Sequence, residues 1–346
     1  MYAIINFNWY RSMNLEEVAK RAKVSTATVS RVLNNVGPVR TTTRARVLRA
    51  VEELKYRPNL HARNLAGGKS RTIGMIVSNM ENPFFVDIYR AAEEVARASG
   101  YEILLANTDY RPEHLVNSIH LMIGRRVSGL ALIVSEMDPG LLQELADRET
   151  PVVFYDVGTV QRNISNIAVN YAKGIERVVN YLHDLGHERM AFVSHHPSLG
   201  PLGARERAFR ETVANYSPAI EWKVVANIDG IDGGRDATRE ILQSGSHPTA
   251  VICTNDFMAL GVLHELREAG LKVPREVSVT GFDNIKLAEI SAPPLTTLHI
   301  PRARIGQLMF QLLVERQESQ GEVGRELIID PEFVLRGSTG PAKRPS

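Results

Sequence analysis

The sequence predicts two structural classes in one chain: an all-α helix-turn-helix head and a larger α/β body of parallel sheets covered by helices. Short amphipathic helical patterns fill residues 13–56. From residue 72 on, apolar runs of strand length alternate with helix-length amphipathic segments. The 346 residues suffice for two or three domains, and the charge is unequally divided between head and body.

The charge division predicts an anionic partner for the head. Residues 13–71 contain 13 Lys and Arg against 4 Asp and Glu, whereas residues 72–346 contain 27 against 35. The overall charge of +2 therefore hides a basic head and a mildly acidic body. A basic head attached to an acidic body is typical of proteins that bind nucleic acid, although a solvated basic face is the alternative.

The composition excludes several classes of protein. Hydrophobic residues make up 44% and charged residues 23%, as in an ordinary globular protein. The single cysteine, Cys253, cannot form an internal disulfide, which fits a reducing compartment. No apolar run approaches the roughly 18 residues of a membrane helix. Residues 1–12 lack the features of an export signal, so we expect a disordered extension or misassigned start, a cytoplasmic protein and no membrane partner.

Residues 13–56 predict three short helices that form a DNA-binding domain. Asn14 is a good N-cap, and Ser25 caps a second helix whose apolar residues recur at helical spacing. Only Lys23 and Val24 separate the first two helices, so these must cross steeply, as in a helix-turn-helix. A third helix, at about residues 42–54, completes a small core.

Residues 57–71 predict a linker that folds only when a partner holds it. Pro58 and Asn59 favour a helix start, and Gly67 with Gly68 ends it. A helix of at most nine residues is marginal in water. We therefore expect the linker to act as a switch.

The body predicts repeated βαβ units. Eight apolar runs are expected to be strands: 73–77, 103–106, 129–134, 152–155, 190–193, 224–226, 250–253 and 277–281. They fit either one large sheet or two lobes of the same type. Residues 338–346, rich in Pro and basic residues, predict a flexible tail.

The head motifs are the most specific feature of the sequence. They read VS at 24–25, TVSRVLN at 28–34, YRPN at 56–59 and LAG at 65–67. With looser matches in the body, at 82–85, 107–109, 127–129, 254–256, 281–283 and 294–297, this pattern resembles the lactose-repressor (LacI/GalR) family of bacterial transcription regulators. The resemblance covers residues 14–337.

The resemblance implies a homodimer with a periplasmic-binding-protein-like body. Residues 72–337 would bind the effector and dimerise. The first lobe would comprise about 72–168 and 300–329, and the second lobe about 169–299 and 330–337, with crossing strands as the hinge between them.

Several head residues are predicted to contact DNA. The second helix would enter the major groove with Thr26 and Ala27 nearest the base edges. Arg31, one turn on, can contact guanine in a bidentate fashion, worth roughly 1–3 kcal/mol of discrimination, and its alternative is a surface salt bridge. Short polar groups suit phosphate oxygens, and their alternative is capping and solvation: these are Ser25, Thr28, Ser30 and Asn34.

The resemblance extends these contacts to the linker. Tyr56 would contact a phosphate, although a core role with a hydrated hydroxyl is equally open. Asn59 and Ala62 belong to the linker helix, which in the family pairs with its copy in the minor groove. Leu65 matches the leucine that wedges between base pairs and kinks the duplex; a simple interface leucine is the alternative.

The effector site is predicted at the carboxyl ends of the strands. Phe84 and Phe85 follow the first strand and match the family's pocket-lining pair, with core packing as the alternative. Asn255 and Asp283 follow later strands. Their amide and carboxylate suit the paired hydroxyls of a saccharide, with strand-end capping as the alternative.

Further candidates come from matching alone. Arg205 stands four residues before an aromatic residue, as the family's ligand arginine does, whereas Arg207 keeps an R-x-R spacing, so both stay open. Ser78, Arg126 and Asp156 are added by the same matching. Asp229 departs from the family, because it lies near a position often occupied by a stacking aromatic residue.

These observations predict a ligand-responsive repressor of carbohydrate-metabolism genes. It would bind a near-palindromic double-stranded operator as a dimer, with a sugar or sugar derivative in the cleft and no cofactor. Neither G-x-S-x-G, H-E-x-x-H, a Walker loop nor G-x-G-x-x-G occurs, so we expect no enzyme. The alternative is a sugar-binding protein of the periplasmic type without DNA function.

Overall fold

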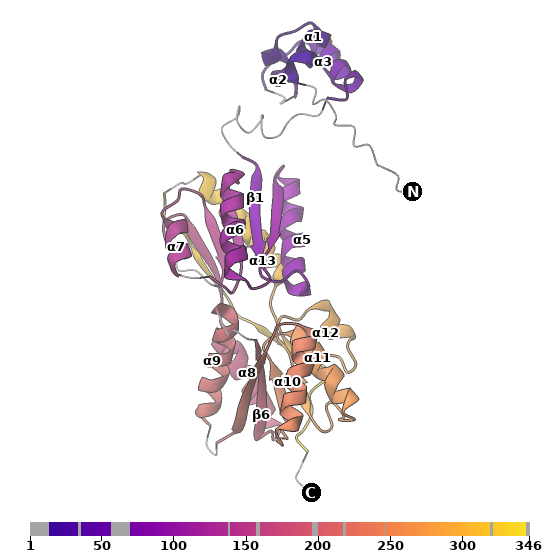
Figure 1. Cartoon of the computed structure of the whole chain (residues 1–346), viewed down its shortest axis with the longest axis vertical. Helices are drawn as coiled ribbons and strands as arrows, with labels where there is room; N and C mark the ends of the chain where they lie inside the picture. Colours follow the sequence, from indigo (N-terminus) through magenta and orange to yellow (C-terminus); the bar gives the residue numbers. More distant parts are fainter. Residues whose placement is uncertain are drawn as a thin grey trace, which may run out of the picture. The chain divides into compact units, whose positions relative to one another are not determined.

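The computed structural model describes residues 14–33, 36–56, 70–137, 139–156, 160–195, 200–216, 219–245, 247–318 and 321–343 (Figure 1). Contacts divide the chain into two compact units, Met1–Ser70 and Arg71–Ser346. We call the described part of the first unit the head and that of the second unit the body. Among the described residues, no helix has both the length and the apolar character needed to cross a bilayer.

The head contains the three predicted helices: α1 (Leu15–Ala22), α2 (Thr26–Leu33) and α3 (Thr41–Glu53). Asn14 caps α1 in a reciprocal capping box with Glu17. Both predicted N-caps are confirmed, because Ser25 Oγ accepts a hydrogen bond of 3.2 Å from the amide of Thr28. Lys23 adopts the left-handed region at the tight turn between α1 and α2.

One small core holds the three head helices together. Val18, Val29 and Val47, one from each helix, are each fully buried. Small alanines fill the space around them, and Tyr56 packs partly buried against the same cluster. The core is small because about 40 residues enclose little volume.

The body contains twelve strands in three sheets. The six-stranded parallel sheet has the order β11-β5-β4-β3-β1-β2, the four-stranded parallel sheet has the order β7-β6-β8-β9, and β10 pairs antiparallel with β12. The strands are β1 (Thr72–Val77), β2 (Glu102–Asn107), β3 (Leu130–Ile133), β4 (Val152–Tyr155), β5 (Ile164–Val169), β6 (Arg189–His195), β7 (Glu221–Asn227), β8 (Ala250–Cys253), β9 (Ser278–Thr280), β10 (Thr297–His299), β11 (Glu326–Ile329) and β12 (Glu332–Val334).

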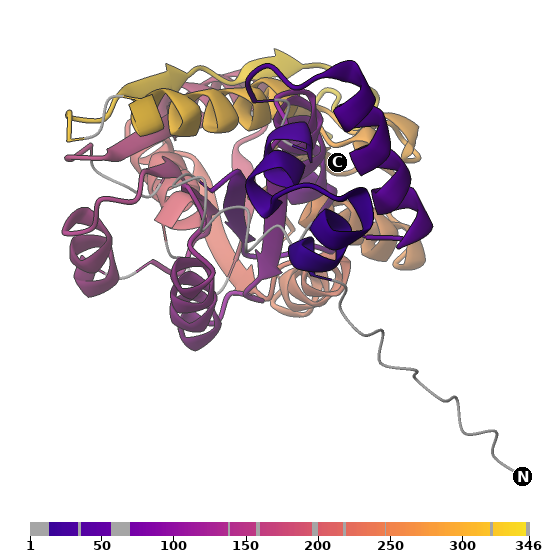
Figure 2. The ribbon, with the colours of Figure 1, turned by 90° about the horizontal axis from the view of Figure 1, so that it is seen from above.

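Each parallel sheet is the centre of one lobe. The helices are α5 (Pro83–Ala98), α6 (Pro112–Gly124), α7 (Pro139–Ala146), α8 (Tyr171–Asp184), α9 (Gly200–Ala214), α10 (Ile231–Gln243), α11 (Asp256–Glu268), α12 (Lys286–Ile290) and α13 (Arg302–Glu318). In the first lobe α6 and α7 cover one face and α5 and α13 the other (Figures 1 and 2). In the second lobe α8 and α9 lie on one side of β6 and α10 and α11 on the other. The structure therefore has two lobes rather than one large sheet.

The chain passes between the lobes three times. It leaves the first sheet after β5, returns between β10 and α13, and leaves again between β11 and β12. The antiparallel pair β10–β12 aligns two of these passages, with Leu298 opposite Phe333. One buried hydrophobic cluster also contains residues of both lobes, among them Tyr155 of the first and Phe282 of the second.

The expected flexible tail is wrong for residues 338–343. Ser338 is fully buried, and its hydroxyl donates to Val279 O at 2.6 Å. Gly340 O lies 3.0 Å from Nε2 of His187, and the amide of Ala342 donates to Leu185 O at 2.8 Å. The polar composition misled the prediction, because these groups satisfy backbone atoms at the edge of the second lobe. Residues 344–346 lie outside the described residues.

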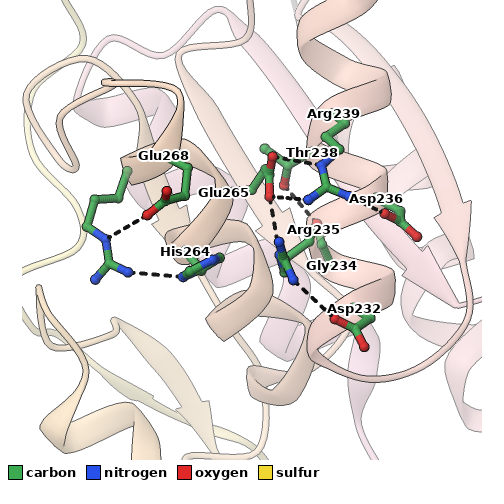
Figure 3. A network of polar contacts seen from close by, with 10 residues as sticks. Asp232, Gly234, Arg235, Asp236, Thr238, Arg239, His264, Glu265 and Glu268 are labelled. Carbon is green, nitrogen blue, oxygen red and sulfur yellow. Dashed lines mark hydrogen bonds and ion pairs between the residues drawn. The ribbon is translucent and has the colours of Figure 1, made fainter.

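Helices α10 and α11 approach each other closely. A Cβ atom on Gly234 would lie 2.0 Å from Met258 O, and one on Gly261 would lie 2.0 Å from Ile231 O. Glu265 bridges the pair at the surface, accepting hydrogen bonds from Arg235 and Arg239 (Figure 3). Glycine at these positions is therefore a packing requirement of the second lobe.

Candidate functional site

The head presents the predicted DNA-contacting residues of α2 on one exposed face. Thr26, Ala27 and Arg31 are exposed, while Val29 and Val32 point into the core. This division follows from helical periodicity, because residues 26, 27 and 31 lie opposite the apolar stripe. The exposed face offers small groups near the start of α2 and one guanidinium a turn further on.

Among the short polar residues of the head that are candidates for phosphate contacts, some also take part in helix capping. Ser25 is exposed, and Thr28 and Ser30 are half-buried. The hydroxyls of Ser25 and Thr28 lie 3.0 Å apart, so the predicted alternative of capping holds for Ser25 without removing it from the surface. Asn34, Asn59, Ala62 and Leu65 lie outside the described residues, so they stay predictions.

The sequence analysis did not predict two cationic residues beside α2 as candidates for DNA contact. Lys20 and Lys23 line a shallow depression together with Thr26, at the turn between α1 and α2. Both are exposed, and neither is paired with a carboxylate within the described residues. Glu16 lines the same depression, so two ammonium groups and one carboxylate lie beside the start of α2. Lysines at such a position can contact phosphate oxygens.

The body contains a cleft between its lobes at the carboxyl ends of the strands. Five predicted residues are brought together there: Phe84, Phe85, Arg205, Asn255 and Asp283. The other lining residues are Asn82, Tyr110, Ile133, Val134, Ser135 and Tyr155. The two tyrosines were missed, although each comes at or just after the end of a strand, where the topology places ligands.

Aromatic rings form the wall on the first lobe. Phe84 meets Phe85 edge to face at 5.3 Å between ring centroids, and the centroid of Tyr155 lies 5.6 Å from that of Phe84. Asn82 fixes this wall, because its Oδ1 accepts a hydrogen bond of 3.0 Å from the amide of Phe84 and so caps α5. The alternative of core packing also holds in part, because both phenylalanines are buried.

Arg205 is the arginine of the cleft. Its Nη1 donates to Thr254 O at 2.6 Å, and its Nη2 lies 3.4 Å from Asp283 Oδ1. The guanidinium also stacks over Phe282, 4.1 Å from the ring centroid. Arg207, the alternative from sequence, is exposed on α9 and does not line the cleft.

Asp283 combines deep burial with incomplete hydrogen bonding. Burial raises its pKa to about 7, although Arg205 and Arg302 oppose the shift. Within the described residues, Asp283 Oδ1 and Arg205 Nε make no hydrogen bond. Both residues line the cleft, and buried polar atoms without a hydrogen bond are groups that a polar ligand could satisfy.

Asn255 serves two purposes at once. Its Oδ1 accepts from the amide of Met258 at 2.8 Å and caps α11, as the capping alternative expects. Its Nδ2 donates to Asp229 Oδ1 at 2.7 Å and lines the cleft. The cap therefore orients the amide group toward the cleft.

Three other predicted ligand residues do not line the cleft. Arg126 lies away from it, exposed between α6 and β3, at the amino ends of the strands. Ser78 is fully buried and donates to Glu136 at 2.7 Å. Asp156 accepts from the amide of Val169 at 3.0 Å, and burial raises its pKa to about 6. Ser78 and Asp156 therefore lie at the carboxyl ends of strands but do not line the cleft.

The chain matches two family models. The model for bacterial regulatory proteins of the lacI family matches residues 14–59, and that for the periplasmic binding protein-like domain matches residues 179–339. The HTH-type transcriptional repressor PurR of Vibrio campbellii is 36% identical over 328 residues, covering 94% of this chain and 98% of the relative. This chain belongs to the LacI family. PurR of Histophilus somni is also 36% identical, with the same coverage.

Solved structures agree with this LacI-family membership. A lac repressor dimer bound to operator and the anti-inducer ONPF superposes with a TM-score of 0.83 at 27% identity, covering 95% of this chain and all of the repressor chain. The complex of the regulator CelR with cellobiose gives a TM-score of 0.69 at 27% identity, covering 94% and 99%.

Family membership confirms the predicted fold class and function in outline. This LacI-family chain is a ligand-responsive, sequence-specific DNA-binding transcriptional regulator, and it is not an enzyme. The alternative of a sugar-binding protein without DNA function is not supported, since the full-length relatives are repressors.

Proposed function

We propose that this chain is a homodimeric repressor whose cleft binds a carbohydrate effector and whose heads bind a near-palindromic operator. The observation that carries the effector class is the buried pair Arg205–Asp283 in a cleft that Phe84 and Phe85 also line, with Arg205 Nε and Asp283 Oδ1 making no hydrogen bond within the described residues. A guanidinium and a carboxylate can together bind paired hydroxyls, and Phe84 offers a face for the apolar side of a sugar ring. Residues 13–56 would bind DNA and residues 57–71 would form the linker.

Two solved relatives support this effector class. CelR is seen with cellobiose, and a LacI-family regulator from Enterococcus faecium is seen with ribose, at 27% identity to this chain in each case. The lac repressor in complex with its operator is a dimer. Two heads related by a twofold axis would meet half-sites about one helical turn apart.

Coupling would run through the three connections between the lobes. A ligand that binds both lobes stabilises one relative orientation, and that orientation sets the distance between the two linkers of the dimer. The linkers can fold and pair on DNA only at one spacing. Coupling of this kind is typically 1–3 kcal/mol, or about 5- to 150-fold in operator affinity.

A binding screen tests the effector class. Purified full-length protein is tested by thermal shift against pentoses, hexoses, disaccharides and, as the competing class, free nucleobases. We expect one carbohydrate to raise the melting temperature and to shift operator affinity, and the direction of that shift distinguishes an inducer from a corepressor. Asp283→Ala should abolish both effects while operator binding without ligand persists. Stabilisation by a nucleobase and by no carbohydrate would contradict the proposal.

A further inference from the structure

Asp229 joins the two lobes through its own carboxylate. It lies in the loop between β7 and α10 of the second lobe. From the first lobe, Asn79 Nδ2 donates to Asp229 Oδ2 at 3.0 Å and the hydroxyl of Tyr110 donates to the same oxygen at 2.7 Å. From its own lobe, Asn255 Nδ2 donates to Oδ1 at 2.7 Å. Three charge-assisted hydrogen bonds thus meet on one half-buried carboxylate.

The geometry of the first lobe holds Tyr110 in this contact. Asp109 and Tyr110 both have positive φ, which turns the chain sharply after β2 and directs the ring across the cleft. The ring also lies against His195 of the second lobe, at 4.5 Å between centroids. Burial and the neighbouring Asp229 raise the pKa of Tyr110, so its hydroxyl keeps the proton that it donates.

The contact borders the cleft in which the effector is proposed to bind. Two of the donors to Asp229, Tyr110 and Asn255, are themselves lining residues of the cleft. The cleft offers a space of only about 30 Å³, less than a sugar occupies. The cleft must therefore widen to take a sugar, and widening by separation of the lobes would break the hydrogen bonds from Asn79 and Tyr110.

We propose that Asp229 is a latch that holds the two lobes closed without an effector. The proposal rests on the proposed function, in which an effector binds in this cleft. An aromatic side chain at this position could stack on a ligand but could not accept these hydrogen bonds. Asp229 therefore makes closure a property of the protein alone, and an effector must compete with the donors of the first lobe or replace them with its own hydroxyl groups.

The distance between the lobes tests the latch directly. Spin labels on Asn117→Cys in α6 and Glu211→Cys in α9 report the separation, since both positions are exposed and the native Cys253 is buried and escapes labelling. Labelled chains are diluted with unlabelled chains, so that each distance lies within one subunit. The measurement needs neither effector nor DNA.

Asp229→Ala is expected to shift the distance distribution to longer values and to broaden it. Tyr110→Phe, which keeps the ring against His195 and removes only the hydroxyl, should give a smaller shift in the same direction. The matched control is Asp232→Ala, which removes an exposed carboxylate three residues away that pairs with Arg235 of the same helix (Figure 3).

An unchanged distribution in both Asp229→Ala and Tyr110→Phe would overturn the latch while leaving the proposed function intact. A shift in Asp232→Ala equal to that in Asp229→Ala would also overturn it. Failure of the unmodified protein to bind any operator would instead contradict the proposed function and leave the measured distances standing.

Discussion

At the residue scale, Asp283 is a buried carboxylate that the protein's own groups pair incompletely. Among the described residues its only cationic neighbour in ion-pair range is Arg205, which lies 3.4 Å away and is shared with Thr254 O and two aromatic rings. The pairing is therefore incomplete, and burial dominates its pKa. A ligand hydroxyl that donates to Asp283 would stabilise the ionised form and lower that pKa.

This predicts a specific pH dependence of stability. The folded state binds a proton at Asp283 near pH 7, whereas the unfolded chain does so near pH 3.9, so the free energy of unfolding should rise as the pH falls from 8 to 6. Asp283→Asn stays neutral and should flatten this rise, measured by urea denaturation at each pH. Asp232→Asn, an exposed control, should leave it unchanged. A rise of the same size in Asp283→Asn would contradict the prediction.

Arg31 gives the corresponding prediction for the head. Because its side chain is exposed on α2, Arg31→Ala should leave thermal stability unchanged. Loss of a bidentate contact to guanine should weaken operator binding about 5- to 150-fold and relax discrimination at one base pair of each half-site. The measurement is titration of the operator and of duplexes substituted at single positions. An equal loss on every duplex would show a phosphate contact instead.

At the scale of elements, the close approach of α10 and α11 makes a stability prediction. Gly234→Ala places a methyl group against the carbonyl of Met258, so the helices must separate, and the free energy of unfolding should fall by about 1–3 kcal/mol. Gly124→Ala at the end of α6 meets no atom within 4 Å and serves as the matched control. Chemical denaturation compares the two. Equal stability of both variants would contradict the packing argument.

The elements also show what periodicity can predict. All eight apolar runs form strands, and the central ones, such as β3, β4 and β8, are continuously hydrophobic because they are buried on both faces. β11 was missed since it is an edge strand with an alternating, half-exposed pattern. β5 is fully paired, but Ser165 and Asn166 interrupt its apolar run. Ser165 Oγ accepts from the amide of Arg325, and Asn166 Nδ2 donates to Glu326, so their partners lie in a segment that the local sequence cannot reveal.

The sequence could likewise predict some residues of the candidate site but not others. The placement of Asn255 and Asp283 at the cleft was predictable, because each comes soon after the end of a strand and the topology gathers the carboxyl ends, and Phe84 lies at the start of the helix that follows β1. Arg205 could be chosen over Arg207 only once helix α9 showed which side chain faces the cleft. The contacts of Asp229 with the first lobe depend on side chains some 120–150 residues away in the chain, so no local pattern predicts them.

At the scale of the whole molecule, the basic head should make operator binding depend on salt. Each phosphate neutralised by a lysine or arginine releases a counterion, so the logarithm of the binding constant falls linearly with the logarithm of salt concentration. Lys20→Ala and Lys23→Ala should each remove about one phosphate contact per head. The salt dependence should then become less steep, and binding should weaken on all duplexes alike. Unchanged slopes would place these lysines away from the phosphate backbone.

The most direct test is selection of binding sites by the full-length protein from random duplex DNA, with the head residues unaltered. The expected result is enrichment of a near-palindrome that two chains bind and whose half-sites lie about one helical turn apart. In the same selection, the Arg31→Ala variant should lose the base preference at one position of each half-site. Recovery of no enriched sequence, or of a single unpaired half-site bound by one chain, would contradict a dimeric repressor that reads an operator through its heads.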